Sequence, residues 1–593
     1  EEMAGLEKAF YGRIVQKVGD RRYLEDWSKD VAEIAKRHIT KINDLIDSQP
    51  GAKQAFDVFL TSLQHNINSS VDKKQAIEML AQHLITQPIF EALFEGYSFV
   101  KDNPVSHAMN DVVSAFSVFG FDKEQKELAP FYESVKLRAS GIDNAEAKQK
   151  IIITLYDKFF RTGFKETTEQ LGIVFTPVEV VDFIIKSVDY ALNKYFGKHL
   201  SSKNVHILDP LTGTGTFMTR TLQYFKQQMD NREITFEDIL HKYNHELHAN
   251  EIVLLSYYIA SINIEAVFDE VNGPERGYEP FEGIVLTDTF ESTERENSFI
   301  DELLGENNKR LKKQQEQSIT VILGNPPYSA KQKNEDNNFK RTSYAKLDNS
   351  LKNLWVDTST ATNKNGLSDT YIKAMRWAAD RISGNGIIGF ITNNSYIDGV
   401  SMDGMRKALL NEFSDIYVIN LKGKIRGKTK KQIADEGGNI FDIMTGVAII
   451  LLVKDNKKKG KGILHYFDIG KGLTKKEKLD KLKKLDSIST IEKDLKCIKP
   501  NEKGDWINQR NSNFEMLLKL GDKKTEDSLF IDYTGGIKTG RDAWSWGFSK
   551  SNVKNKIVKL IEYYNNNLGN TDVYDENTND ISWTRSLKQI GRA

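Results

Sequence analysis

Cysteine is almost absent from this 593-residue sequence, which contains only Cys497. A single cysteine cannot form an internal disulfide bond, and it excludes a metal site built from several cysteines. A chain without disulfide bonds is typical of a reducing compartment, so we expect a cytoplasmic location. The ten histidines show no metal-ligand spacing such as H-E-x-x-H, so the sequence predicts no metal site.

Long hydrophobic runs are also missing. No apolar stretch approaches the roughly 18 to 20 residues of a membrane-spanning helix, and no cleavable signal pattern opens the sequence. We therefore expect no membrane partner. The formal net charge is zero, with 83 basic and 83 acidic side chains, so a surface for a polyanion has to come from local segregation of charge.

The patterning divides the chain into three parts. Residues 1–165 show apolar spacings of three and four, as in KDVAEIAKRHITKINDLI, which predict an all-helical domain. In residues 166–460, β-rich runs such as VHILDP, GIIGFIT and VAIILLV alternate with helical stretches, which predicts a doubly wound α/β sheet. Residues 461–593 mix both signals and predict an α+β domain. The sequence stops without a closing element, so we expect a piece of a longer polypeptide.

The stretch VHILDPLTGTGTF, residues 205–217, predicts a strand that runs into a glycine turn. Asp209 ends the strand, and Gly213 and Gly215 allow the backbone to approach a ligand closely. Taken alone, such a turn is compatible with many nucleotide-binding folds or with plain helix–strand packing. Glu251, in LHANEIV, is the next acid at a plausible strand end, where it could bind a ribose diol; a solvated loop glutamate has the same pattern.

A second stretch, VILGNPPY at residues 321–328, ends an apolar run with an amide, two prolines and an aromatic ring. Proline lacks the N–H group, so the strand cannot continue through it. The side-chain oxygen of Asn325 and the carbonyl of Pro326 are two acceptors that suit a planar NH₂ group, and Tyr328 offers a ring for stacking. The carboxyl end of a strand is where open α/β sheets bind ligands. The tetrapeptide therefore predicts activation of an exocyclic amine for methyl transfer.

The last third of the chain is basic and then aromatic. Residues 421–500 contain 21 Lys and Arg against 10 Asp and Glu. Lys457, Lys458 and Lys459 could position a DNA duplex through its phosphates, or they could form a solvated surface. Arg541 lies among aromatic residues in GRDAWSWGF and could pair with guanine, although the same residues could form a hydrophobic core.

Two activities leave no pattern in these residues. GKIRGKT, residues 423–429, is one residue short of the phosphate-loop pattern G-x-x-x-x-G-K-[ST] and fits a basic surface loop better. No cluster of paired carboxylates with a lysine predicts a nuclease. ATP hydrolysis and DNA cleavage, where the parent protein has them, are expected outside this chain.

The two motifs together carry a resemblance. Asp209-Pro210-x-x-Gly213-Thr214-Gly215 followed by Asn325-Pro326-Pro327-Tyr328 resembles S-adenosylmethionine (SAM)-dependent amino-methyltransferases that act on adenine N6 in DNA, with the motif order of their gamma group. KVGDRRYLEDWSKDVAEIAKRHI, LGIVFTPVEVVDFI, EGGNIF and TGGIKTGRDAW further resemble the single-polypeptide type ISP restriction–modification enzymes. The resemblance spans about residues 10 to 585.

In that family a nuclease and a helicase-like ATPase precede a helical coupler, a methyltransferase and a target recognition domain. The resemblance implies that this chain begins in the coupler and ends inside the recognition domain, and that ATP and Mg serve only the missing domains. Double-stranded DNA is the implied partner. The implied SAM-binding residues are Thr176, Pro177, Asp209, Pro210, Gly213, Gly215, Glu251, Asp288 and Thr289.

The resemblance also implies how the target base is held. Asn325, Pro326, Pro327 and Tyr328 would hold an adenine swung out of the duplex, because a base inside the helix cannot present N6 to both acceptors and methyl donor. Phe441 could stack on the other face of the base, although an aromatic residue before a strand is more often part of a core.

Other functions remain open at this stage. The chain could be a stand-alone adenine DNA methyltransferase without restriction activity. An RNA or a protein-glutamine methyltransferase uses a similar tetrapeptide, because its target is also a planar NH₂ group. A non-catalytic DNA-binding specificity module is a further alternative, although scaffolding requires no paired acceptors.

Overall fold

The computed structural model describes most of the chain in several ranges, and every structural statement below concerns these residues. The chain divides into two compact units, Glu1–Gln509 and Arg510–Ala593, which are described separately. The described residues are 20–93, 103–119, 176–294 without 274, 303–328, 344–510 without 458, 513, 516–522, 527–534 and 545–566.

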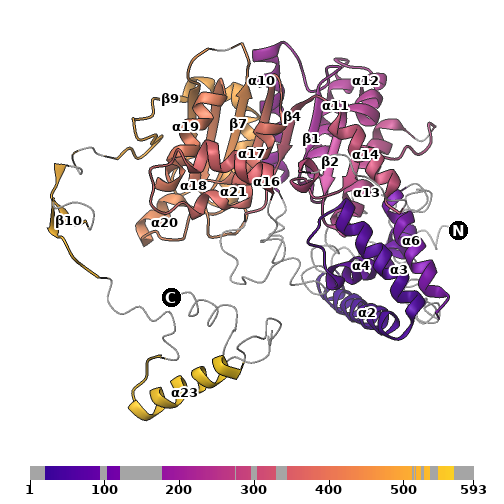
Figure 1. Cartoon of the computed structure of the whole chain (residues 1–593). Coiled ribbons are helices and arrows are strands. Elements are labelled where there is room, and N and C mark those ends of the chain that lie inside the picture. The colour runs from indigo at the N-terminus through magenta and orange to yellow at the C-terminus, as the bar shows by residue number, and fades with distance from the viewer. Residues whose placement is uncertain are drawn as a thin grey trace. The chain divides into compact units, whose positions relative to one another are not determined.

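The amino-terminal part of the first unit is helical (Figure 1). Helices α3 and α6 each begin with proline in the first turn, where the missing N–H group has no intrahelical partner to lose. Asn103 caps α6 by accepting from the backbone N–H groups of Val105 and Ser106. The described part confirms the predicted helical region; its helices are α2 (Asp20–Ser48), α3 (Pro50–Asn66), α4 (Lys73–Leu93) and α6 (Pro104–Ser117).

A nine-stranded sheet follows, in the order β3-β2-β1-β4-β5-β7-β6-β8-β9. Strands β1 to β6 and β8 are parallel, whereas β7 lies antiparallel between β5 and β6, and β9 is antiparallel to β8. The strands are β1 (His206–Asp209), β2 (Leu247–Glu251), β3 (Ile284–Leu286), β4 (Ile319–Gly324), β5 (Gly386–Asn393), β6 (Asp415–Lys422), β7 (Val447–Lys454), β8 (Ile463–Asp468) and β9 (Lys496–Ile498).

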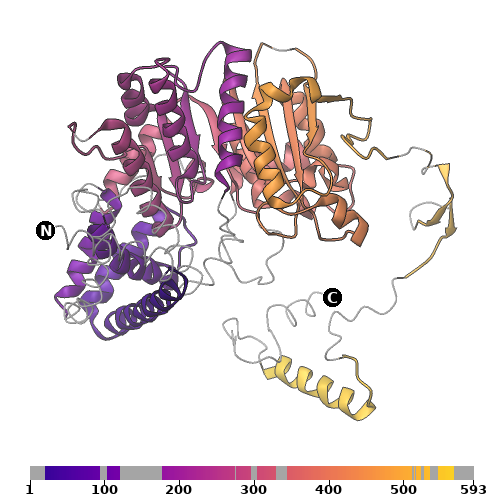
Figure 2. The same ribbon diagram turned by 180° about the vertical axis from the view of Figure 1, so that it is seen from behind.

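Helices cover both faces of this sheet, which confirms the predicted doubly wound α/β fold (Figures 1 and 2). Successive strand residues point to opposite faces, so Ile449 and Leu451 of β7 enter one core while Ile450 and Leu452 enter the other. The first core includes α10 (Val178–Phe196), α11 (Thr216–Asp230) and α13 (Leu254–Asn272), and the second includes α16 (Ala345–Leu351), α17 (Thr370–Arg381) and α19 (Asp403–Glu412).

The helical region and the sheet region share one hydrophobic core. Helix α13 is buried along almost its whole length, because α4 packs against it as well as β2 and β3. Polar pairs complete the contact. Nδ1 of His83 lies 3.0 Å from the hydroxyl of Tyr258, and the amide of Asn103 donates to the hydroxyl of Tyr257 at 3.1 Å. The helical region therefore packs against the sheet region through buried apolar contacts and hydrogen bonds.

The predicted domain limits stay predictions. The limit at residue 460 falls between β7 and β8, yet both strands belong to one sheet, which continues to β9. The second unit contains a small parallel pair, β10 (Lys519–Gly521) and β11 (Ser528–Phe530), and helix α23 (Lys550–Asn566). None of the helices in the described ranges combines the length and apolar character needed to cross a bilayer.

Candidate functional site

The candidate site lies where the strand order reverses. Strands β2 and β3 lie on one side of β1 in the sheet, and the next strands of the chain, β4 and β5, lie on the other side of β1. Open parallel sheets bind ligands at the carboxyl ends of the strands at such a point. Asp209 ends β1 and Gly324 ends β4, and a Cβ atom added to Gly324 would lie 3.2 Å from Oδ1 of Asp209. The glycine turn and the tetrapeptide therefore meet.

The two glycines of the turn have different roles. Both adopt the left-handed conformation that favours glycine, with φ of +57° at Gly213 and +84° at Gly215. A Cβ atom on Gly215 would lie 3.2 Å from the backbone of Ala260, whereas one on Gly213 meets no described atom within 4 Å. Gly215 is thus required for packing against α13, and Gly213 faces space that a ligand can use.

Glu251 ends β2 and is bonded to the glycine turn rather than solvated. Its Oε2 accepts from the N–H of Gly213 at 2.7 Å, and its Oε1 accepts from Ile252 at 2.9 Å and Val253 at 2.8 Å. Burial raises the pKa of Glu251 to about 7, against the effect of these three donors. A carboxylate has about four lone-pair sites, so one remains for a ligand hydroxyl.

Asp209 is a fully buried acid with an unused acceptor. Its Oδ1 accepts from the N–H of Leu211 at 3.2 Å, and its Oδ2 has no hydrogen-bond partner among the described residues. Burial raises the pKa of Asp209 to about 8, and the charge of Glu251 acts in the same direction. A buried acceptor without a partner is destabilising, so a donating or cationic ligand group would relieve this site.

Asp288 follows β3 and receives four donors. Its Oδ1 accepts from the N–H groups of Phe290 at 2.9 Å and Glu291 at 3.3 Å. Its Oδ2 accepts from the hydroxyl of Tyr344 at 2.9 Å and from the side-chain amide of Asn68. Burial raises the pKa of Asp288, although these donors oppose the effect. Sequence reasoning missed Asn68 and Tyr344, because neither belongs to a local motif.

The other residues predicted to bind the cofactor lie in two parts of the site, one at the loops after β1 and β3 and one beside the tetrapeptide. Thr289 is buried, and its hydroxyl donates to the carbonyl of Pro210, which ties the loop after β3 to the turn after β1. Thr176 instead lies beside the tetrapeptide, where its Oγ1 accepts from Nδ2 of Asn325 at 2.9 Å. Pro177 follows Thr176 and precedes α10. Thr176 therefore orients the amide that was predicted to act on the substrate.

The tetrapeptide leaves β4 with its amide held in one orientation. Nδ2 of Asn325 donates to Thr176, while Oδ1 accepts from the hydroxyl of Tyr328 at 2.8 Å. An amide oxygen has two lone pairs, so one remains for a substrate donor. Pro326 is buried, and Pro327 and Tyr328 are half-buried. Burial raises the pKa of Tyr328 well above its ordinary value, so its hydroxyl stays a neutral donor.

Aromatic rings surround the tetrapeptide. The ring of Phe441 lies 6.2 Å from that of Tyr328, centroid to centroid, at an interplanar angle of 60°. A planar base stacked between two rings requires nearly parallel rings about 7 Å apart, so these two rings would have to separate slightly and turn toward parallel to admit one. Tyr371 of α17 meets the Tyr328 ring edge-on at 6.4 Å. Its helical spacing resembles that of core residues, and sequence reasoning missed it.

Asn439 fixes the loop that carries Phe441. The amide donates to the carbonyls of Gly423 at 3.1 Å and Thr445 at 2.6 Å, and its oxygen accepts from the N–H groups of Phe441 at 2.8 Å and Ile443 at 3.3 Å. This buried side chain therefore uses its full hydrogen-bonding capacity to close the loop between β6 and β7. Asn439 belongs to the stretch EGGNIF, whose resemblance to the type ISP enzymes was the only sign in the sequence that this loop matters.

The predicted DNA-contacting lysines lie away from this edge. Lys457 and Lys459 are exposed in the turn after β7. Because β7 is antiparallel, Lys454 at its end pairs with Gly386 at the start of β5, so this turn lies at the edge opposite Asn325. Lys458 and Arg541 lie outside the described residues, and the assignment of all four to DNA stays a prediction.

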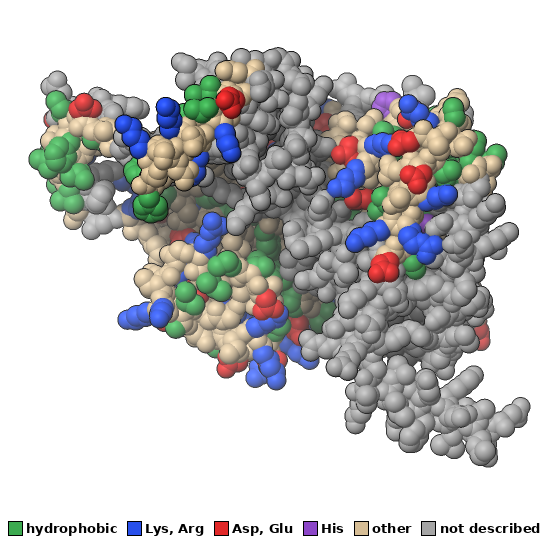
Figure 3. Space-filling view, turned by 90° about the horizontal axis from the view of Figure 1, so that it is seen from below, with side chains coloured by type: hydrophobic (Ala, Val, Ile, Leu, Met, Phe, Trp, Pro, Cys, Tyr) green, Lys and Arg blue, Asp and Glu red, His purple; other side chains and the backbone are tan. Residues whose placement is uncertain are grey.

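A different basic segment lies at the carboxyl edge of the sheet. Arg426 is exposed in the connection between β6 and β7, which also contains Phe441, and Lys430 and Lys431 are exposed at the start of α20 (Lys430–Glu436) in the same connection. On the face seen from below, basic and acidic side chains of the described residues are interspersed (Figure 3). Among the described residues, the Arg426–Lys431 segment thus lies at the same edge of the sheet as the tetrapeptide.

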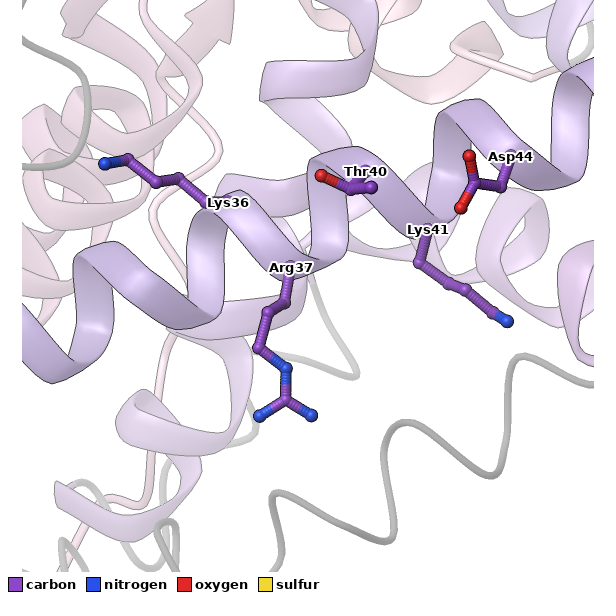
Figure 4. A pocket seen from close by; sticks show the side chains of 5 residues that line it. All are labelled: Lys36, Arg37, Thr40, Lys41 and Asp44. Carbon is purple, nitrogen blue, oxygen red and sulfur yellow. The ribbon is translucent and has the colours of Figure 1, made fainter.

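A shallow surface hollow lies apart from this site, on the solvent-facing side of α2. Its side chains recur at helical spacing and point away from the helix axis (Figure 4). They are Lys36, Arg37, Thr40, Lys41 and Asp44. Such an arrangement is typical of an exposed helix face. No group of three or more metal-ligating side chains occurs in the described ranges.

Three family models match the chain in order. The type ISP restriction-modification enzyme coupler domain matches residues 23–147, the Eco57I restriction-modification methylase matches residues 215–425, and the type ISP C-terminal specificity domain matches residues 528–593. The methylase match includes Gly215, Glu251 and the tetrapeptide. The fold and this site thus define the class as a restriction–modification methylase.

Solved structures narrow the class. The ATP-dependent type ISP restriction-modification enzyme LlaBIII bound to DNA is 65% identical, with a TM-score of 0.92. The match covers 99% of this chain and 40% of the LlaBIII chain. A nuclease-deletion mutant of the type ISP enzyme LlaGI with a DNA substrate mimic is 52% identical with a TM-score of 0.87, covering 99% and 48%. The DrdV–DNA complex is 30% identical with a TM-score of 0.82, covering 93% and 53%.

The chain belongs to the type ISP restriction–modification enzymes and carries their coupler, methylase and specificity regions. It spans about half or less of the length of these solved relatives. A search of curated proteins found no match.

Proposed function

We propose that this chain transfers a methyl group from SAM to N6 of an adenine that is swung out of duplex DNA. The observation that carries the proposal is the position of Asn325. Its amide oxygen accepts from the hydroxyl of Tyr328, whose ring lies 6.2 Å from that of Phe441, at the strand end next to Asp209. The DNA bound to LlaBIII and the DNA substrate mimic bound to LlaGI support DNA as the substrate.

The buried carboxylates fit SAM. Bound SAM supplies an electrophilic methyl group and carries an amino group, a ribose diol and an adenine ring. Asp209 offers an unpartnered acceptor for the cationic end, and Glu251 has a lone pair left for the ribose hydroxyls. Asp288 and Thr289 lie at the next strand end, where the adenine ring would bind. Among the described residues, no atom comes within 4 Å of a Cβ placed on Gly213, so that side of the turn leaves room for SAM.

The tetrapeptide acts on the target amine. Oδ1 of Asn325 and the carbonyl of Pro326 accept its two hydrogens, which directs the nitrogen lone pair at the methyl carbon. Bound SAM would supply the methyl group to this nitrogen, its C–S bond breaking with the electron pair left on sulfur, and the extra proton would then pass from the nitrogen to water. Tyr328 and Phe441 contact the two faces of the base. Extrusion is necessary because a stacked adenine cannot reach these groups, and it costs a few kcal/mol.

The activities of the whole protein extend the proposal. We propose that the parent polypeptide also contains a nuclease and a helicase-like ATPase, which use ATP and Mg, and that it works in the cytoplasm as a restriction–modification enzyme. A stand-alone methyltransferase, an RNA or protein-glutamine methyltransferase, and a non-catalytic specificity module are the competing functions.

A labelled-methyl assay separates these functions. The chain is incubated with labelled SAM and, in parallel, duplex DNA, RNA and protein. Transfer to N6 of adenine in DNA is expected. Label on RNA or protein alone would assign another substrate, and SAM binding without transfer to any of the three would favour the specificity module. A 2-aminopurine at the target position is expected to brighten on binding, as the base leaves the stack.

A further inference from the structure

Asp288 accepts a hydrogen bond from a residue outside the methylase region. Its Oδ2 accepts from the side-chain amide of Asn68, a residue 220 positions earlier in the sequence. Asn68 lies in the turn between α3 and α4, inside the segment that matches the coupler. Neither side chain is exposed to solvent by more than 4%. A coupler side chain thus contacts a carboxylate of the proposed cofactor site.

The orientation of Asn68 is set by its own turn. Its Oδ1 accepts from both the N–H of Ser70 at 2.8 Å and the hydroxyl of Ser70 at 2.6 Å. The amide nitrogen therefore has to point at Asp288. The turn itself is closed by backbone bonds from Asn68 to Leu63 at 3.2 Å and from Val71 to Asn68 at 3.1 Å. Asn68 is a rigid donor rather than a mobile one.

The donors on Asp288 are not equivalent. A carboxylate has about four lone-pair sites, and the four donors described above fill them. The two on Oδ1 belong to the backbone of the same loop. On Oδ2, Asn68 is fixed at its far end, whereas Tyr344 contributes a hydroxyl at the tip of a long side chain. A ligand amine would therefore replace Tyr344 and leave Asn68 in place.

We propose that Asn68 is a positioning residue of the cofactor site: it keeps the Asp288 carboxylate oriented toward the exocyclic amine of the cofactor's adenine ring. Cofactor binding and docking of the α3–α4 turn on the methylase region consequently reinforce each other. This inference rests on the proposed function, because it assumes that SAM is the ligand. It goes beyond that function by giving the coupler a part in cofactor binding.

The interface offers a matched control. Asn66, two residues from Asn68, is also buried, and its Oδ1 accepts from the amide of Asn308 at 2.7 Å. Asn66→Ala therefore removes a polar contact between the same two regions without touching Asp288. Tyr344→Phe removes the other side-chain donor from the same oxygen. Ser70→Ala is a milder change, since it removes the hydroxyl that orients Asn68 and leaves the amide itself.

SAM titration by calorimetry of the full chain is the first test. Asn68→Ala is expected to weaken SAM binding about tenfold, the scale of losing one hydrogen bond to a charged group. Asn66→Ala and Tyr344→Phe are expected to stay within about twofold of wild type, or, for Tyr344→Phe, to bind more tightly. Ser70→Ala is expected to weaken SAM binding less than Asn68→Ala does. If Asn68→Ala does not fold, Ser70→Ala takes its place in the test.

Hydrogen exchange is the second test, because a merely structural role would not change it. SAM is expected to slow exchange of the N–H groups of residues 67–71 in wild type and in Asn66→Ala, and to have no effect on them in Asn68→Ala. Equal weakening by Asn66→Ala and Asn68→Ala, or unchanged affinity in Asn68→Ala, overturns this inference alone. Wild-type protein that binds no SAM overturns the proposed function and this inference together.

Discussion

The hydroxyl of Tyr328 donates a hydrogen bond of 2.8 Å to Oδ1 of Asn325, the atom proposed to accept from the target amine. With Thr176 on the amide nitrogen, this bond fixes which way the amide faces. The acceptor is thus preorganised before a base arrives, and the base takes the second lone pair of Oδ1 or displaces the hydroxyl. Substitutions at Asn325 and Tyr328 distinguish orientation of the acceptor from stacking.

Asn325→Ala is expected to abolish methylation while SAM binding is retained. Removing one preorganised hydrogen-bonding group commonly lowers a rate by about 10²–10³. The methyl-transfer rate at saturating SAM and DNA measures the loss, and calorimetry with SAM is the control. Activity within about tenfold of wild type would contradict the role given to Asn325.

Tyr328→Phe and Tyr328→Ala separate the hydroxyl from the ring. The phenylalanine variant keeps the stacking surface and loses one neutral hydrogen bond, so methylation is expected to change by no more than about tenfold. The alanine variant also loses the stacking contact, which is worth about 1–3 kcal/mol per base. Its kcat/KM is expected to fall well below that of Tyr328→Phe. Equal kinetics in both variants would exclude Tyr328 as a stacking residue.

Glu251→Ala is expected to weaken SAM affinity by roughly 1.5–3 kcal/mol, the scale of hydrogen bonds to charged groups. The carboxylate also holds the N–H of Gly213, so the variant loosens the glycine turn as well as losing its ribose contact. Glu251→Gln, which keeps one acceptor oxygen, is expected to lose less. Calorimetry measures both, and an unchanged dissociation constant for Glu251→Ala would remove Glu251 from the site.

SAM affinity is expected to depend on pH. In the cofactor-free fold the pKa values of Asp209 and Glu251 are raised to about 8 and about 7. The cationic end of SAM favours ionised carboxylates and lowers these values, so binding releases protons. Affinity is therefore expected to fall as pH drops below 8, by up to about tenfold per pH unit for each group that titrates.

Calorimetry in buffers of different ionisation enthalpy counts the protons released on SAM binding. Asp209→Asn is the control that is expected to reduce this number.

The raised pKa values of Asp209 and Glu251 also mean that the folded state holds more protons than the unfolded state between about pH 4 and 8. The free energy of unfolding of the cofactor-free chain is therefore expected to fall as pH rises across this range. A SAM affinity independent of pH between 6 and 8.5 would contradict the coupling.

Two sets of basic residues provide a matched test of DNA binding. Neutralising Lys430 and Lys431, at the edge that carries the tetrapeptide, is expected to weaken binding to all duplexes and to flatten the salt dependence. Each lost phosphate contact changes the log–log slope by about one. Neutralising Lys457 and Lys459 at the opposite edge is expected to have a smaller effect. The reverse order in a salt titration would support the lysines predicted from the sequence.

The sequence by itself determined the local elements. Alternating or continuous β-rich runs predicted β1, β4, β5 and β7, and apolar spacings of three and four predicted α2, because these patterns depend on neighbouring residues. The glycine turn and the Asn-Pro-Pro-Tyr stretch were recognisable for the same reason. Their backbones require glycine at positive φ or exclude a continuing strand, whatever surrounds them.

Only the tertiary structure decided which of these elements meet. Strand order brings Asp209 next to Gly324, and the antiparallel insertion of β7 places Phe441 at the site while it sends Lys457 to the opposite edge. Asn68 reaches Asp288 across 220 residues of sequence. Such contacts depend on how whole helices and strands bury their apolar faces against one another. The local pattern around either partner does not contain that information.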